Sequence, residues 1–184
     1  MKKESKKILL DIARNSIRSY MYDDRFSFPS AYDEELKLSL GVFVTLTIQG
    51  ELRGCIGYVT GIKPLLNSVF EMAREAAFDD PRFHPLTREE LDEIEIEISV
   101  LTPLEKVDQN YKAVIGVDGL IVRKGYRSGL LLPQVAVEWR YDSEQFIQQT
   151  CLKAGMNKRC YIDKDVEIFK FQAEIFNEKE FSND

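Results

Sequence analysis

Two stretches of the chain carry apolar residues at intervals of three and four, the spacing that places them on one face of a helix. The first stretch predicts a helix that Ser5 caps and that ends near Tyr22. The second predicts a helix over 65–77, with Pro64 in its first turn because proline has no N–H to leave unpaired there. The segment Asp79–Pro81 ends this second helix.

Other stretches show the pattern of β-strands. Val42–Ile48 is rich in β-branched and aromatic residues, and a short turn containing Gly50 joins it to Leu52–Tyr58, so the two runs predict an antiparallel hairpin. Apolar and polar residues alternate over Ile94–Val100, as in a strand with one solvated face. The run Val166–Phe176 predicts a last strand with an irregularity near Ile168–Phe169. Two shorter glycine-flanked runs also predict strands, Leu120–Val122 and Leu130–Leu132.

Capping signals mark two further helix starts. Thr87 and Glu90 have the spacing of a capping box, which predicts a short helix there. Asp142 and Gln145 have the same spacing before an amphipathic run that Gly155 ends. Strands therefore arrive in groups without regular alternation with helices, and the pattern predicts an α+β fold with mainly antiparallel sheets and flanking helices.

Size and charge narrow the function classes. A chain of 184 residues has the usual length of one domain, and we expect residues 1–184 to fold as a single domain. The net charge of −6 makes nucleic acid an unexpected partner, because phosphate binding depends on clustered lysine and arginine. No run of 18 apolar residues occurs and no signal peptide is recognisable, so we expect a cytoplasmic protein without a membrane association.

Cysteine usage points the same way. Cys55, Cys151 and Cys160 are odd in number and do not resemble the paired framework of a small secreted protein, so reduced thiols are expected. Cys151 stands among apolar residues at helical spacing, which indicates core packing. With a single histidine, His84, and no Cys-x-x-Cys pair, the sequence predicts no structural metal site and no cofactor.

Candidate chemistry concentrates in the strand Leu52–Tyr58. Alternation places Arg53, Cys55 and Gly57 on one face of this strand. Glycines within a strand, here Gly54 and Gly57, mark close approach by a ligand or by another part of the backbone. A nearby guanidinium would stabilise a thiolate, the reactive form of cysteine, so Cys55 is the candidate catalytic residue. The alternative is that a helix packs on the glycines and Cys55 is a small buried apolar residue.

The loop 79–85 holds further candidates. Asp80 and Arg82 lie in a dense group of charged and ring-containing residues, and loops of this kind often bind substrates. A constellation of Cys55, His84 and Asp79 is conceivable, although an aspartate–Arg82 pair that shapes a turn is the favoured interpretation.

Three candidates lie in the second half of the chain. Gln134 follows a strand, where it could point into a cleft or cap the next turn. The basic residues of the segment 123–127 could hold phosphate, but the solvated tip of a hairpin explains them equally well. Trp139 and Tyr141 are most simply packing residues.

Several segments in order along the chain together resemble the AMMECR family. The most specific is Leu52–Gly57, with the sequence LRGCIG. The other matching segments are Asp80–Phe83 with Pro85, Gly116–Leu120, Gly129–Val135 and Cys151–Gly155.

The resemblance implies an α+β fold with two lobes around a cleft, a larger lobe whose sheet is flanked by helices and a smaller antiparallel one. It also implies similarity to the A component of the AmmeMemoRadiSam system, and thus Memo-like and radical SAM proteins as partners. No established activity comes with the family, and its motif leaves the position of His84 open, which argues against a Cys–His dyad.

Together these observations lead to a functional hypothesis with one competitor. The protein is an accessory or enzymatic component of a modification pathway, and a cleft near Arg53 and Cys55 binds an anionic small molecule or a modified group of a partner. Residues predicted to bind are Arg53, Gly54, Gly57, Asp80, Arg82 and Gln134. The alternative is a non-catalytic module that binds a protein or a nucleic acid. Whether the protein is an enzyme, and its oligomeric state, are left open.

Overall fold

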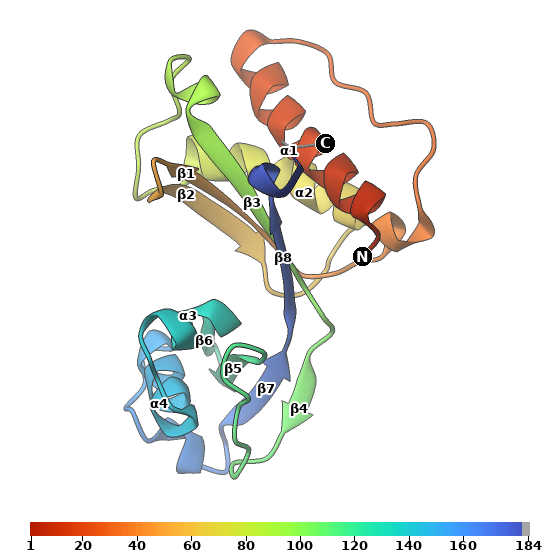
Figure 1. Ribbon diagram of the computed structural model, residues 1–184. Helices are drawn as coiled ribbons and strands as arrows, with labels where there is room; N and C mark the ends of the chain where they lie inside the picture. The colour runs from red at the N-terminus through yellow and green to blue at the C-terminus, as the bar shows by residue number, and fades with distance from the viewer. Residues whose placement is uncertain (182–184) are drawn as a thin grey trace. The chain divides into compact units, whose positions relative to one another are not determined.

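The computed structural model describes residues 1–181 and divides into two compact units. Unit 1 comprises Met1–Leu101 together with the chain from Glu174 on, and unit 2 is the intervening segment Thr102–Ala173. Each unit has one four-stranded sheet and its own hydrophobic core (Figure 1). The predicted α+β class is confirmed.

Unit 1 is built from two helices, four strands and several short helical turns. Its elements are α1 (Lys3–Tyr22), η1 (Glu34–Lys37), β1 (Val42–Ile48), β2 (Glu51–Tyr58), α2 (Leu65–Arg74), η2 (Glu75–Asp79, a π-helical turn), η3 (Glu90–Asp92), β3 (Ile94–Leu101), β8 (Ala173–Asn177) and η5 (Glu178–Phe181). The strand order is β2-β1-β3-β8, and β1 runs antiparallel to both β2 and β3. The predicted hairpin is confirmed.

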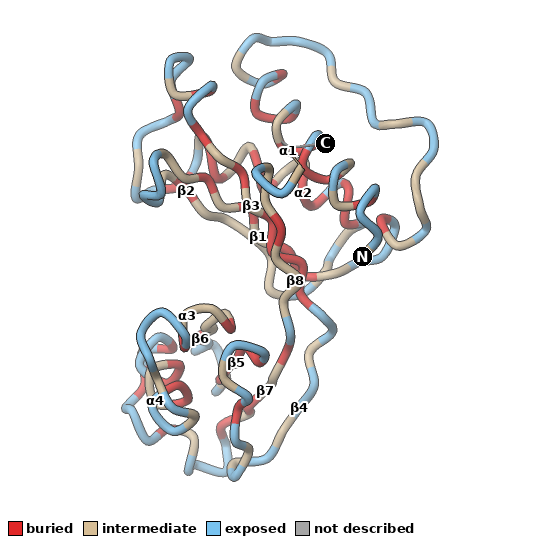
Figure 2. Tube along the Cα trace, in the orientation of Figure 1, coloured by how far each residue is buried: buried red, intermediate tan, exposed pale blue. Residues whose placement is uncertain are grey.

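Alternation along β1 determines which face of this sheet is covered. Val42, Val44 and Leu46 are fully buried, whereas Phe43 and Thr45 between them are partly exposed. Helices α1 and α2 pack against each other over the buried face (Figure 1). Buried residues accordingly run along the inner sides of these helices and along β1 and β3 (Figure 2).

The start of α1 differs from the prediction. The helix begins at Lys3, and Ser5 is a buried residue of its first turns whose hydroxyl has no hydrogen-bond partner within residues 1–181. Ser5 is therefore not the cap. Two hydrogen bonds hold the chain before the helix instead. The Met1 ammonium donates to the Glu174 carboxylate at 2.7 Å, and the Lys2 N–H donates to the Glu35 carboxylate at 3.0 Å. Helical geometry therefore begins earlier than predicted.

Unit 2 contains a second sheet and two helices. Its elements are β4 (Glu105–Val107), β5 (Gly119–Lys124), β6 (Arg127–Leu131), α3 (Pro133–Glu138), α4 (Ser143–Lys153), η4 (Cys160–Ile162) and β7 (Glu167–Phe171). The strand order is β4-β7-β5-β6, with antiparallel pairing throughout. The predicted capping box of α4 is present, since Asp142 and Gln145 each accept the other's backbone N–H.

The predicted single strand Val166–Phe176 is two strands that belong to different sheets. The chain breaks at Gln172, between β7 and β8, and not near Ile168–Phe169. Gln172 exchanges hydrogen bonds with Thr102: its N–H donates to Thr102 Oγ1 and its carbonyl accepts from the Thr102 N–H, both at 2.8 Å. These bonds replace the ladder at the break, and the alternation shifts there because the strand changes sheet.

The cysteines of unit 2 correct the expectation of reduced thiols. Cys151 and Cys160 form a disulfide, and only Cys55 among the three is free. After α4 the chain reverses at Gly155, whose φ of +68° suits glycine, and this reversal returns Cys160 to within 5.8 Å of Cys151 between Cα atoms. The inference from cysteine usage to a reducing compartment loses its support, whereas the prediction that Cys151 is a core residue is confirmed.

Two other features bear on the predictions. Trp139 is 68% exposed and stacks on Tyr141 at the surface, so it is not the packing residue that the sequence indicates. Its position immediately after α3 ends takes its ring out of the core. Among residues 1–181 no helix combines the length and apolar character needed to cross a membrane.

Candidate functional site

A β-bulge in β2 positions the first candidates. Leu46 of β1 pairs with Gly54 and the next residue, Thr47, pairs with Leu52, so Arg53 is an extra residue without a partner in β1. Bulges re-aim side chains, and here the strict alternation ends at the bulge. Strict alternation would place Leu52 on the same face as Ile56, but Leu52 is 43% exposed whereas Ile56 packs on the core of unit 1.

Cys55 lies on the face of the sheet opposite to the helices. Its thiol is partly buried, and the hydroxyl of Thr45, directly across on β1, donates a hydrogen bond to Sγ at 3.3 Å. Cys55 is thus a free thiol with a hydroxyl beside it.

Asp80 fastens this strand to the loop that follows η2. Its carboxylate is buried, with 4% of the residue exposed, and it accepts the Cys55 N–H at 2.9 Å. The same carboxylate accepts the Arg82 N–H at 3.1 Å and two guanidinium N–H groups of Arg82 at 2.9 and 2.7 Å. These donors, the Arg82 side chain first, hold the pKa of Asp80 well below its ordinary value against the opposing effect of burial.

Arg82 completes the connection from the other side. Its Nη2 donates to the Cys55 carbonyl at 3.1 Å, so Asp80 and Arg82 together hold both backbone polar groups of Cys55. The Arg82 side chain is 53% exposed, and its guanidinium lies 5.5 Å from the centre of the Phe83 ring. The favoured sequence interpretation, an aspartate–Arg82 pair that shapes the loop, describes this geometry.

Arg53 is more deeply buried than Arg82. The Glu90 carboxylate accepts hydrogen bonds from Nε and Nη2 of Arg53 at 2.8 and 2.9 Å. The His84 carbonyl accepts a further hydrogen bond from Nη2 at 2.9 Å. The Arg53 side chain is 13% exposed, and its Nη1 is buried without a hydrogen-bond partner within residues 1–181. The pair lowers the pKa of Glu90, chiefly through the hydrogen bond from Arg53.

Glu90 has two roles, of which the sequence revealed one. The capping box with Thr87 is present, at 2.9 and 3.4 Å, and leads into the short helical turn η3. The pairing of Glu90 with Arg53 joins residues 37 positions apart, and nothing local announces it. The Thr45 hydroxyl was also missed, because the bulge at Arg53 shifts the hairpin register and only this shift places Thr45 opposite Cys55.

An open pocket of about 500 Å³ lies in unit 1 beside these ion pairs. Arg53 and Arg82 both line it, as do Phe83 and His84, which directly follow Arg82 in the chain. Cys55 is not among the lining residues, so its backbone, through Arg82, is the link between thiol and pocket.

The two glycines of the motif are explained by packing. A Cβ on Gly54 would lie 2.0 Å from the Ala76 carbonyl oxygen, and one on Gly57 would lie 2.3 Å from the Val42 carbonyl oxygen. Gly54 therefore lets the π-helical turn η2 pack directly on β2. This is the alternative in which a helix packs on the glycine, and ligand binding by either glycine stays a prediction.

The histidine constellation is not assembled. Within residues 1–181, no hydrogen bond joins the side chain of His84 or Asp79 to the Cys55 thiol, and His84 contributes its carbonyl to Arg53. Gln134 is the second residue of α3 in unit 2, where its Oε1 is buried without a hydrogen-bond partner in the described chain. It makes no capping bond there, and its proposed role in binding stays a prediction.

The basic segment of unit 2 lies at a hairpin tip, as its alternative interpretation has it. Arg123 lies over the Phe169 ring at 5.4 Å, and Lys124 forms an ion pair with Asp163. Gly125, with φ of +58°, turns the chain between β5 and β6. No cluster of three or more histidine, cysteine or carboxylate side chains in residues 1–181 has the arrangement of a metal site.

The fold and this site define a two-sheet α+β protein in which a cysteine-containing strand is tied to a following loop by two arginine–carboxylate pairs. The AMMECR1 family model matches residues 10–176, and the chain belongs to this family.

Similar proteins come from archaea. A protein of Methanothermobacter thermautotrophicus is 43% identical over 185 residues, covering 97% of this chain and 96% of the relative. One of Thermococcus gammatolerans is 45% identical over 190 residues, covering 97% and 93%. The crystal structure of an uncharacterised protein of Pyrococcus horikoshii matches with a TM-score of 0.87 at 43% identity, covering 96% of this chain and 93% of that one.

Proposed function

We propose that the surface around Arg53, Cys55 and Arg82 binds an anionic group, carried by a small molecule or by a modified residue of a partner protein. The protein would then be an accessory or enzymatic component of a modification pathway. The observation that carries this proposal is the position of Arg82, half-exposed at an open pocket and hydrogen-bonded to the backbone of Cys55.

The two arginines of the site have different roles, because their ion pairs leave them exposed to different extents. Arg53 is enclosed by Glu90 and the His84 carbonyl, so it shapes the pocket wall. Arg82 is held on one side by Asp80 and exposes the rest of its guanidinium, which offers N–H donors to a carboxylate or a phosphate. Because Asp80 fixes the guanidinium in place, little side-chain entropy remains to be lost on binding.

A chemical role for Cys55 is the finer part of the proposal. The Thr45 hydroxyl is the group that contacts Sγ, and a hydroxyl is a poor base. Cys55 therefore supports a role in positioning Arg82 beside the ligand, through its carbonyl, more readily than one as an activated nucleophile, which needs an adjacent base.

The binding test uses anions as probes. NMR titration with pyrophosphate and with succinate should shift amide signals of residues 80–85 and of β2. Arg82→Gln should weaken the affinity about tenfold, the usual effect of losing one charge-assisted hydrogen bond. Arg25→Gln, which changes an exposed arginine outside the pocket, is the matched control and should leave the affinity unchanged. Shifts confined to other regions, or an unaltered affinity in Arg82→Gln, would contradict the proposal.

Membership in a pathway is tested separately. Memo-like and radical SAM proteins are the proposed partners, and recombinant versions mixed with this protein should form a complex that sedimentation detects. Cells carrying Cys55→Ser should lose the pathway's product if the thiol acts chemically. If Cys55→Ser keeps every phenotype while reversal of exposed charges abolishes function, the protein is a non-catalytic interaction module. Strongly salt-dependent RNA binding would identify that module as a nucleic-acid binder.

A further inference from the structure

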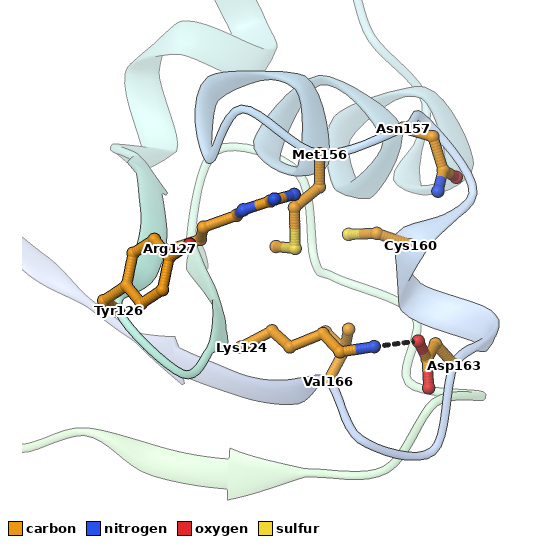
Figure 3. Close-up of a pocket in the computed structure, with 8 residues that line it drawn as sticks. All are labelled: Lys124, Tyr126, Arg127, Met156, Asn157, Cys160, Asp163 and Val166. Carbon is orange, nitrogen blue, oxygen red and sulfur yellow. Dashed lines mark hydrogen bonds and ion pairs between the residues drawn. The ribbon is translucent and has the colours of Figure 1, made fainter.

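Unit 2 has a pocket of its own, formed by the β5–β6 hairpin tip and the segment that follows α4 (Figure 3). Its volume is about 380 Å³, and it is separate from the residues that carry the proposed function. The lining residues that matter here are Lys124, Arg127, Met156, Asn157, Cys160 and Asp163.

The disulfide meets this pocket through one sulfur. Cys151 is fully buried in the core of unit 2 and does not line the pocket, whereas Cys160 lines it and is 4% exposed. In Figure 3 the Cys160 sulfur points inward among the lining side chains. An incoming thiol can therefore approach Cys160 and not Cys151. Burial thus makes Cys160 the sulfur that is attacked and Cys151 the leaving group.

The surroundings of that sulfur are cationic in an otherwise acidic chain. Lys124 forms an ion pair with Asp163, so these two charges offset each other. Arg127 is exposed, and its side chain has no ion-pair partner among the described residues. Among the charged residues that line the pocket, Lys124 and Arg127 outnumber Asp163, although the whole chain carries −6. A negatively charged molecule is favoured here over a neutral or positive one.

We propose that this pocket admits an anionic low-molecular-weight thiol that opens the Cys151–Cys160 disulfide by exchange. The thiolate attacks Cys160 Sγ, a bond forms between the two sulfurs, and the bond to Cys151 breaks. Cys151 leaves as a thiolate and takes a proton from solvent. A second thiolate then attacks the mixed disulfide at the sulfur of the small molecule and releases Cys160 as a thiolate. The two small thiols are oxidised to their disulfide, and the protein disulfide is reduced by the same two electrons.

The structural consequence is confined to one corner of unit 2. The disulfide joins α4 to η4 across the reversal at Gly155, and Gly129 of β6 packs against Ala154 at the same place. Opening the bond releases the segment 157–162 from α4, while the backbone hydrogen bonds from Ala154 and Met156 to α4 and the sheet pairings of unit 2 remain. This proposal concerns unit 2 alone and does not depend on the proposed function of unit 1.

Three thiols of similar size and different charge test the proposal: 2-mercaptoethanesulfonate, 2-mercaptoethanol and cysteamine. The rate of disulfide reduction in the native full-length protein is measured by alkylating the released thiols at successive times and determining the protein mass by mass spectrometry. Each rate is divided by the rate of the same thiol on the urea-unfolded protein, which removes differences in intrinsic reactivity. The expected normalised ratio of anionic to cationic thiol is about fivefold at low ionic strength, the size of a screened interaction with one charge.

Charge variants around the pocket should move this ratio in opposite directions. Arg127→Gln should bring it close to one, and Asp163→Asn, which frees Lys124, should raise it. Arg140→Gln, an exposed arginine of unit 2 outside the pocket, is the control and should leave it unchanged. Peptide mapping after an acid quench should find the first mixed disulfide on Cys160. The proposal is overturned by a ratio that Arg127→Gln does not change, or by a first adduct on Cys151.

Discussion

The two units organise their cysteines and their cores differently. Unit 1 has a large core beneath α1 and α2, and its one cysteine, Cys55, is a free thiol on the opposite face of the sheet. Unit 2, the segment 102–173, has a smaller core in which both cysteines are joined. A domain of roughly 70 residues seldom gains enough from apolar burial alone, and a disulfide supplies what the small core lacks. Burial of apolar side chains therefore dominates the stability of unit 1, whereas the disulfide contributes to the stability of unit 2.

Close packing at Gly54 tests the first half of this comparison and has the largest expected effect. Gly54→Ala places a methyl group against the Ala76 carbonyl, a backbone atom that cannot rotate away, and should lower the free energy of unfolding by about 3 kcal/mol. Urea unfolding gives the value, and hydrogen exchange should locate the loss in β2 and η2. In Gly50→Ala the new methyl group meets no atom within 4 Å, and the cost should stay near 1 kcal/mol from the φ of +85°.

Removing the disulfide tests the second half. The double variant Cys151→Ala/Cys160→Ala should lower the stability of unit 2 by about 2–3 kcal/mol, the usual effect of opening a short loop. Hydrogen exchange should show the loss in residues 102–173 and little change in unit 1. A reductant should reproduce the effect in the wild type and in Cys55→Ala, and should do nothing further to the double variant. Equal losses in both units would contradict the comparison.

Acid should act on unit 1 through Asp80. The folded-state pKa of Asp80 lies below its unfolded value, so its contribution is complete above about pH 4, the ordinary carboxyl pKa, and is lost as the pH falls toward the folded-state value. Asp80→Asn should cost about 2 kcal/mol at pH 7, because charge-assisted hydrogen bonds are lost. This difference from the wild type should shrink between pH 4 and pH 2, as followed by thermal unfolding. A difference that is constant with pH would exclude the carboxylate charge as the cause.

Arg53→Lys tests how much the ion pair with Glu90 contributes to the stability of unit 1, and its expected effect is the smallest. Lysine cannot reproduce the two parallel bonds to Glu90 and the bond to the His84 carbonyl, so a loss of about 1 kcal/mol is expected. The same substitution at Arg25, which is exposed, should cost nothing measurable. Chemical denaturation of the wild type and the two variants in parallel measures both differences. If Arg53→Lys equals Arg25→Lys, the ion pair does not hold the loop.

Local patterns were enough for most elements. The hairpin β1–β2, the alternating strand β3, the helix α4 with its Asp142 cap and the Thr87–Glu90 box all follow from residues within a few positions of one another. The prediction that Ser5 caps α1 was wrong because contacts of Met1 and Lys2 with distant residues determine where the helix begins. The break at Gln172 was misplaced because it depends on Thr102, seventy residues away.

By itself the sequence determined the fold class, the family and the short list of candidate residues, since periodicity, capping and the LRGCIG motif are local signals. Tertiary structure decided what those residues do. It gave Arg53 its partner Glu90, placed Arg82 and Asp80 on the backbone of Cys55, and joined Cys151 to Cys160. Each of these contacts joins residues that come together only after the chain turns or crosses between strands. The spacing of residues along the sequence does not specify which distant residues meet in this way.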